Sequence, residues 1–218
     1  MLQQEAVVQE MITLIKELQS DSLFNNHILA GGTALALQLG HRTSTDIDLF
    51  TPKPQNAQVL VNYFEKKYKK TKVEVAENDF TRIYANDIKV EMVQYDEKII
   101  AEPRIEEGIR MFTVNEIAAM KLRAITHRTE PRDFIDLAYL LKEISLKKMF
   151  ELYEEKHGSI SPLYMKRTLL TKSKTIKENE WLVGGIKMLK TDIELNNIPA
   201  IIEQAINEYN ISNNIGIR

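Results

Sequence analysis

Hydrophobic residues recur every three to four positions near the start of the chain, over residues 3–19. The pattern is carried by Val7, Met11, Leu14 and Leu18. This period is typical of an amphipathic helix that packs on a core. A short apolar stretch at residues 27–30 then meets two glycines, and a second helical pattern follows that Gly40 ends. The pattern therefore predicts helix, strand, glycine turn and helix in that order.

Alternation of polar and apolar residues predicts the strands that follow. Residues 45–50 alternate in this way, and residues 55–68 return to a helical period. Three further β-rich stretches come next, at residues 72–76, 80–85 and 88–95. Asn86-Asp87 separates the last two and suits a two-residue hairpin turn.

The pattern becomes helical at Thr113, whose T-x-x-E spacing to Glu116 is that of a capping box. Breaks between helices are predicted at Pro131, at Gly158 with Pro162, and at Gly184-Gly185. The sequence thus predicts an α+β protein, with a mixed β-sheet and helices over residues 1–113. A C-terminal helical domain is predicted over residues 114–218.

Composition narrows the class of protein. With 218 residues, 44% hydrophobic and 28% charged, the chain can bury one sizeable core or two small ones. No apolar run approaches the ~20 residues that span a bilayer, and the N-terminus lacks the apolar segment of a signal peptide. We therefore expect a cytoplasmic protein with no membrane contact. The absence of cysteine excludes disulfides and thiolate metal sites.

The net charge of −2 hides a local excess of basic residues. Residues 121–177 carry 13 Lys and Arg against 7 Asp and Glu, whereas residues 1–120 carry 13 against 18. Such an excess is the electrostatic footprint of a protein that binds a polyanion, but solvated helix faces give similar counts. Both interpretations stay open from the sequence.

The candidate chemistry begins with Asp46 and Asp48, which lie two residues apart in a predicted strand. Successive side chains in a strand point to opposite faces, so both carboxylates share one face. Two carboxylates this close repel unless a divalent cation or water screens them, and a magnesium site is the natural use. In the stretch 88–93 the same alternation leaves Glu91 on the polar face, where a neighbouring strand could add a third carboxylate.

The alternative is an edge strand that only displays acids to solvent. Against it stands Gly31-Gly32-Thr33, a glycine turn that opens a helix shortly before the aspartates. Glycines let a backbone approach a phosphate closely, and a helix N-terminus offers free N–H groups to an anion. A phosphate cradle facing a metal site is much more specific than either feature alone.

These residues carry a resemblance to a known family. The stretch Gly31–Phe50, GGTALALQLGHRTSTDIDLF, resembles the signature of the nucleotidyltransferase superfamily, and more narrowly of the AbiEii/AbiGii toxin-like nucleotidyltransferases of bacterial toxin–antitoxin systems. The narrower resemblance depends on Arg42, on Lys121 and on the R-D-x-x-D segment Arg132–Asp136. The motifs cover residues 25–145, and the rest shares only general helical character.

The resemblance implies a metal-dependent mechanism. Divalent cations, Mg²⁺ or Mn²⁺, would be held by Asp46, Asp48 and Glu91 against a nucleoside triphosphate (NTP) substrate. Glu91 departs from the family pattern, which more often has aspartate at this position, and its longer arm would move the site.

Further roles follow from the same resemblance. The backbone of Gly31, Gly32 and Thr33, with the Thr33 hydroxyl, would hold the distal phosphates. Arg42 and Lys121 would supply cations, and Asp136 would complete the nucleotide-binding set. Lys121 is counted among the catalytic residues, and its helix is expected to point it toward a groove.

The function expected from these residues is transfer of a nucleoside monophosphate (NMP) from an NTP to an acceptor hydroxyl, with RNA such as tRNA as the acceptor. The chain would act as the toxin of a toxin–antitoxin or phage-defence system, with an antitoxin protein as a partner. Two alternatives stay open, a transferase that modifies a small molecule such as an aminoglycoside, and a nucleotide-binding module without catalysis. The intact aspartate pair argues against the second, and the basic segment 121–177 favours RNA over a small molecule.

Overall fold

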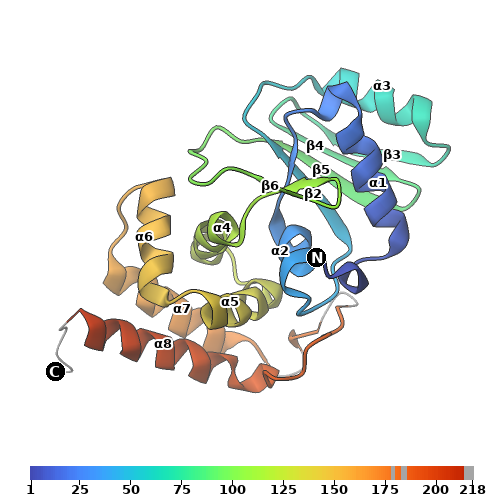
Figure 1. Ribbon diagram of the computed structural model, residues 1–218. Helices are drawn as coiled ribbons and strands as arrows, with labels where there is room; N and C mark the ends of the chain where they lie inside the picture. Colours follow the sequence, from blue (N-terminus) through green and yellow to red (C-terminus); the bar gives the residue numbers. More distant parts are fainter. Residues whose placement is uncertain (178–179, 183–185, 214–218) are drawn as a thin grey trace. The chain divides into compact units, whose positions relative to one another are not determined.

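The computed structural model describes residues 1–177, 180–182 and 186–213 of the chain. The chain divides into two compact units. Unit 1 comprises residues 1–97 and 102–113, and unit 2 comprises residues 98–101 and 114–218. In Figure 1, unit 1 runs from blue to green and contains the sheet, whereas the helices of unit 2 run from green to red.

Unit 1 is built on one seven-stranded mixed sheet with the strand order β3-β4-β5-β2-β1-β7-β6. The strands are β1 Ile28–Leu29, β2 Asp46–Thr51, β3 Thr71–Ala76, β4 Phe80–Ala85, β5 Ile88–Gln94, β6 Arg104–Glu106 and β7 Ile109–Met111. The pairs β2–β5 and β1–β7 are parallel, and the other neighbours are antiparallel. The parallel β2–β5 pair sets two polar strand faces side by side, and the candidate site lies there.

Three helices complete unit 1: α1 Gln9–Ser20, α2 Gly31–Leu39 and α3 Ala57–Lys67. Short 3-10 turns precede and follow α1, at Gln4–Ala6 and Ser22–Phe24. Helix α3 contacts β3 and β4, and α2 contacts β2. The core between helices and sheet contains fully buried Leu18, Leu35, Ile47 and Phe64. Burying these apolar side chains is the main term that stabilises the unit.

Unit 2 is helical. Its helices are α4 Val114–His127, α5 Pro131–Glu143, α6 Leu146–His157, α7 Pro162–Thr175 and α8 Ile198–Ser212, with a 3-10 turn at Leu195–Asn197. Helix α4 packs against α5, α6 and α7, and α8 packs against α5, α6 and α7. Pro131 and Pro162 occupy the first turns of their helices, where the missing N–H costs nothing. Among the described residues, no helix is long and apolar enough to cross a membrane.

The predicted fold class is confirmed, with a mixed sheet and helices followed by helices at the C-terminal side. The predicted hairpin turn is present, since Asn86 and Asp87 both have positive φ, 48° and 70°, as the turn requires. The hairpin β6–β7 was not predicted. Gly184-Gly185, predicted as a break between helices, lies outside the described residues. The division into domains 1–113 and 114–218 stays a prediction.

Candidate active site

Three carboxylates meet on one face of the sheet in unit 1. Asp46 and Asp48 alternate with the fully buried Ile47 on β2, which fixes their direction away from the core. Strand β5 runs parallel to β2 in the register that sets Asp48 opposite Glu91. The third carboxylate therefore comes from the neighbouring strand, at the level of the second aspartate.

The crowding of these carboxylates alters the protonation of Asp48. Burial, followed by the negative charges of Glu91 and Asp46, raises the pKa of Asp48 to about 7. The positive charge of Lys89 opposes this rise. A pKa raised by burial together with neighbouring negative charges is common at functional sites.

Two basic residues that the sequence analysis did not include in the site lie among the carboxylates. The Lys89 ammonium lies 3.0 Å from an Asp46 oxygen and 3.5 Å from a Glu91 oxygen, and Arg82 donates a 2.7 Å hydrogen bond from Nε to Glu91. Burial alone would lower the pKa of Lys89, but its contacts with Asp46, Glu91 and Asp48 raise it. Arg82 could have been found from the sequence, because a two-residue turn at 86–87 sets residue 82 opposite residue 91, whereas the contact of Lys89 with Asp46 depends on the pairing of β5 with β2.

The glycine turn lies directly against the second aspartate. Gly31 has φ +65°, and a Cβ atom at this position would lie 2.1 Å from the Asp48 Oδ2 atom. The Ala30 backbone N–H also donates to the Asp48 carbonyl oxygen at 2.8 Å. Only glycine has both the backbone freedom and the small volume for this approach. The first turn of α2 is thereby held beside the carboxylates.

Thr33, in the first turn of α2, and Arg42, which follows the end of that helix, are both buried. The Thr33 hydroxyl donates to the Asp46 carbonyl oxygen and lies 2.8 Å from the Ser44 hydroxyl. The Arg42 guanidinium occupies the space beside Gly32, where a Cβ atom would lie 2.4 Å from its Nη2 atom. A buried cation at a helix N-terminus gives this end of α2 a concentration of positive charge suited to an anion.

Unit 2 contains a second charged cluster, made of Lys121 and Arg128 from α4 and its end, with Asp133 and Asp136 from α5. The Lys121 ammonium lies 2.7 Å from Asp133 and 2.6 Å from Asp136, and Arg128 Nε lies 2.7 Å from Asp133. Lys121 was expected to point toward a groove, but its side chain is 8% exposed and lies between the two carboxylates. The R-D-x-x-D segment of the sequence supplies this pairing, since residues three apart lie on the same face of an α-helix.

Comparison with known protein families finds one family whose model covers all of these features. Residues 13–206 match the family described as Nucleotidyl transferase AbiEii toxin, Type IV TA system. The match includes the glycine turn, the three carboxylates and the charged cluster of unit 2. The chain belongs to the AbiEii nucleotidyltransferase family. The predicted resemblance and the predicted enzyme class, a nucleotidyltransferase, are both confirmed.

Individual relatives agree with this membership. An uncharacterised protein of Aquifex aeolicus is 28% identical to this AbiEii-family chain over 152 residues, which cover 67% of the chain and 73% of the relative. Among solved structures, a candidate nucleotidyltransferase of Helicobacter pylori superposes with a TM-score of 0.60 at 19% identity, covering 95% of both chains. MenT4, a nucleotidyltransferase toxin of Mycobacterium tuberculosis H37Rv, superposes with a TM-score of 0.56 at 15% identity, covering 89% of this chain and 80% of MenT4. At these identities the two structures show a shared fold.

The carboxylates of this AbiEii-family protein fit a hard divalent cation by their chemistry. Carboxylate oxygens are the ligands that such cations prefer, and the repulsion from Glu91 and Asp46, which adds to burial in raising the pKa of Asp48, is one that a cation would relieve. In the part of the chain that the structure describes, no three His, Asp or Glu side chains already surround one point as metal ligands. Lys89 provides the counter-charge between Asp46 and Glu91 instead.

Proposed function

We propose that this AbiEii-family protein transfers an NMP from an NTP to an acceptor hydroxyl of RNA, with Mg²⁺ or Mn²⁺ as cofactor. The observation that carries the proposal is the contact of the Gly31 turn with Asp48. It brings the anion-binding start of α2 beside the carboxylate set of Asp46, Asp48 and Glu91. Triphosphate and divalent cations are recognised by these two features, respectively.

The reaction exchanges a phosphoanhydride bond for a phosphoester bond. The acceptor oxygen bonds to the α-phosphorus, the bond from that phosphorus to the β-phosphate oxygen breaks, and pyrophosphate and the hydroxyl proton are released. Asp46, Asp48 and Glu91 would hold the divalent cations, which would supply charge neutralisation and lower the pKa of the attacking hydroxyl.

The residues of the chain have separate tasks in this reaction. Backbone N–H groups of Gly31, Gly32 and Thr33 bind the distal phosphates, and the Arg42 guanidinium neutralises their charge. The Thr33 hydroxyl is already engaged with Asp46 and Ser44, so its task is to fasten α2 to β2. In unit 2, roles of Lys121 and Asp136 toward the nucleotide stay a prediction from the family resemblance; within that unit, Lys121 pairs with Asp133 and Asp136, and Arg128 pairs with Asp133.

Membership of a toxin family supports a toxic role that an antitoxin controls, and an antitoxin protein partner stays part of the proposal. The cytoplasm, where NTP and RNA are both present, is the proposed place of action. RNA is the proposed acceptor. A small molecule such as an aminoglycoside is the alternative acceptor, and the test must exclude it.

The test follows label from an α-phosphate-labelled NTP into total RNA and, in parallel, into an aminoglycoside. We expect RNA to become labelled in the reaction with divalent cations. With EDTA no label should be transferred, and addition of Mg²⁺ or Mn²⁺ should restore the transfer. Apparent affinity for RNA should fall steeply as salt rises, because phosphate contacts release counterions. Transfer that persists without divalent cations would contradict the metal requirement, and label on the aminoglycoside alone would contradict the RNA acceptor.

A further inference from the structure

Lys89 is one corner of a square of charged side chains whose other corners are the three carboxylates of the candidate site. Strand register sets Lys89 on β5 opposite Asp46 on β2, and Glu91 on β5 opposite Asp48 on β2. Residues two apart in a strand point to the same face, so all four side chains share one face of the sheet. The square therefore contains three acids and one base.

The Lys89 ammonium bridges the two strands. It lies 3.0 Å from Asp46 Oδ2 on β2 and 3.5 Å from Glu91 Oε1 on β5. Carboxylate oxygens that converge from two strands on one positive group are also what a hard divalent cation requires. The ammonium thus occupies the position between Asp46 and Glu91 that such a cation would take.

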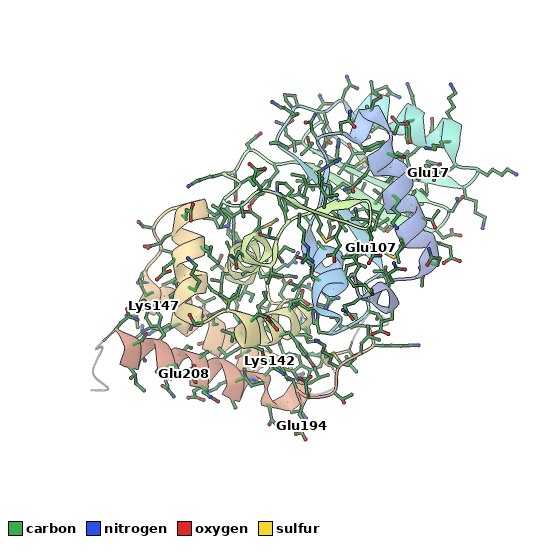
Figure 2. All side chains as sticks on the ribbon, in the orientation of Figure 1. Glu17, Glu107, Lys142, Lys147, Glu194 and Glu208 are labelled. Carbon is green, nitrogen blue, oxygen red and sulfur yellow. The ribbon has the colours of Figure 1, made fainter. Side chains whose placement is uncertain are left out.

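This ion pair is less exposed than the surface pairs of the protein. The side chains of Lys89 and Asp46 are 24% and 25% exposed. Lys142, which Figure 2 labels on helix α5, forms a pair with Asp192 in which the side chains are 46% and 49% exposed. Water and salt screen exposed charges more effectively than half-buried ones. The charge of Lys89 is therefore felt strongly by the carboxylates around it.

Arg82 compensates Glu91 from the other side of β5. Its strand, β4, is separated from β2 by β5 in the order of the sheet. Its guanidinium is shared between Glu91, at 2.7 Å, and Glu74, at 3.2 Å. Arg82 can therefore stay on Glu91 when a cation enters between β5 and β2, whereas Lys89 already lies there.

We propose that the Lys89 ammonium holds the place of a divalent cation between Asp46 and Glu91 and is displaced when that cation binds. If the ammonium stayed, a cation on the same oxygens would lie beside a like charge and be repelled. A divalent cation brings two positive charges to the carboxylates where the ammonium brings one, so abundant cation favours the exchange.

Lys89 therefore has two effects on the site. It keeps the carboxylates compensated before a cation binds, and it raises the cation concentration at which the site becomes loaded. This inference rests on the metal requirement of the proposed function and names the residue with which the metal competes.

Mn²⁺ binding to the nucleotide-free protein, followed by the electron paramagnetic resonance signal of free Mn²⁺, tests the proposal without requiring transfer. Lys89→Met keeps the length of the side chain and removes its charge. It should bind Mn²⁺ about tenfold more tightly than the wild type, because the competing cation is gone. Lys89→Arg keeps the charge and should bind Mn²⁺ no more tightly than the wild type.

Thermal unfolding provides a second measurement that a merely structural role would not reproduce. Without Mn²⁺, Lys89→Met should melt at a lower temperature than the wild type, since the carboxylates lose their counter-charge. At one fixed Mn²⁺ concentration the melting temperature should rise more for Lys89→Met than for the wild type, because the tighter ligand stabilises more. Equal rises for the two proteins would contradict the displacement of Lys89.

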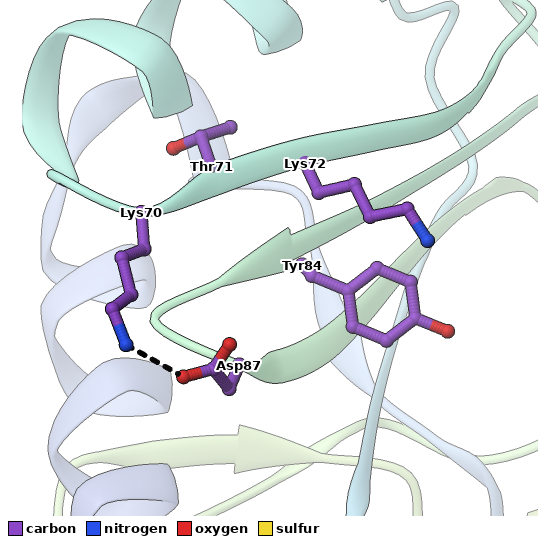
Figure 3. Close-up of a pocket in the computed structure, with 5 residues that line it drawn as sticks. All are labelled: Lys70, Thr71, Lys72, Tyr84 and Asp87. Carbon is purple, nitrogen blue, oxygen red and sulfur yellow. Dashed lines mark hydrogen bonds and ion pairs between the residues drawn. The ribbon is translucent and has the colours of Figure 1, made fainter.

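Lys72→Met is the matched control, because Lys72 lies in the same row of the sheet, two strands from Lys89. Figure 3 shows its side chain extending beside the Tyr84 ring. This variant should bind Mn²⁺ as the wild type does.

The results also separate this inference from the proposed function. If transfer depends on Mg²⁺ but Lys89→Met binds Mn²⁺ no more tightly than the wild type, the displacement of Lys89 is wrong and the proposed function stands. If transfer proceeds without divalent cations, the metal requirement itself is wrong.

Discussion

The backbone conformation of Gly31 and the position of the Asp48 carboxylate depend on one another. Its φ of +65° starts α2, and the missing side chain leaves room for the Asp48 carboxylate. Gly108 has a similar φ, +83°, but nothing lies within 4 Å of where its Cβ would be. Alanine substitutions at the two glycines therefore distinguish the effect of backbone strain from the effect of displacing the Asp48 carboxylate.

Gly31→Ala should reduce turnover by about 100-fold or more, because a carboxylate displaced by about 1 Å loses its productive position. Gly108→Ala bears the same cost of positive φ, about 1–2 kcal/mol, and should retain the wild-type kcat when folded. Steady-state kinetics of both variants measure whether displacement of the carboxylate or backbone strain reduces turnover. Equal kcat for the two would show that the contact between Gly31 and Asp48 has no catalytic importance.

Lys121 has both a proposed task on the triphosphate and a structural one that only the structure reveals. Its ammonium is buried between Asp133 and Asp136. Lys121→Ala should therefore lower the free energy of unfolding by about 3–5 kcal/mol, because it removes the buried cation that lies between two buried carboxylates. Folded Lys121→Ala protein should also lose at least tenfold in kcat or in kcat/KM for NTP, about 1.4 kcal/mol. Normal kinetics with reduced stability would make Lys121 a structural residue alone.

At the scale of elements, the sequence predicted most of unit 1 because its strands are long enough to show alternation. Strands β2, β4 and β5 have six or seven residues each, and the turn at 86–87 has residues that favour positive φ. The hairpin β6–β7 was missed since strands of three residues give almost no periodic signal. Residues 98–101 lie in the sequence between strands of unit 1 but belong to unit 2, and no local pattern could indicate this.

The charged pairs of the site were harder to predict than its carboxylates. Alternation alone placed Asp46, Asp48 and Glu91 on polar faces. The contacts of Lys89 and Arg82 depend on the register between strands. The turn at 86–87 fixes the register of β4 with β5, and tertiary packing fixes the register of β5 with β2. The burial of Lys121 depends on how α4 packs on α5, and helical periodicity alone does not determine that.

The link between α4 and α5 through Asp133 should make unit 2 sensitive to acid. Burial alone would raise the pKa of Asp133, but Lys121 and Arg128 lower it below its ordinary value. A carboxylate with a lowered folded-state pKa stabilises the fold above the unfolded-state pKa, near 3.9, and this stabilisation is lost as pH falls through the folded-state pKa.

Urea unfolding of the wild type and of Asp133→Asn measures this contribution. The difference in unfolding free energy should be large at pH about 7 and should shrink toward pH about 3. Glu151→Gln is the control, because Glu151 forms an exposed pair with Lys148 in the same unit and should change little at either pH. A difference for Asp133→Asn that does not vary with pH would show that its charge has no role in stability.

For the whole molecule, each unit contains one charged cluster. In unit 1 the carboxylates lie beside the start of α2, and in unit 2 Lys121 lies between Asp133 and Asp136. Membership of the AbiEii family establishes nucleotidyl transfer as the activity. We infer that the carboxylates on β2 perform this transfer by binding divalent cations.

The most direct test measures label transfer from NTP by Asp46→Asn and Asp48→Asn in the presence of Mg²⁺. Each should lower kcat by about 1,000-fold or more, about 4 kcal/mol, and Asp48→Asn should not lower the free energy of unfolding, because it relieves repulsion among the carboxylates. Asp87→Asn, at an exposed aspartate in the β4–β5 turn, should transfer label at the wild-type rate. Wild-type turnover by either β2 variant would contradict a role of these carboxylates in transfer.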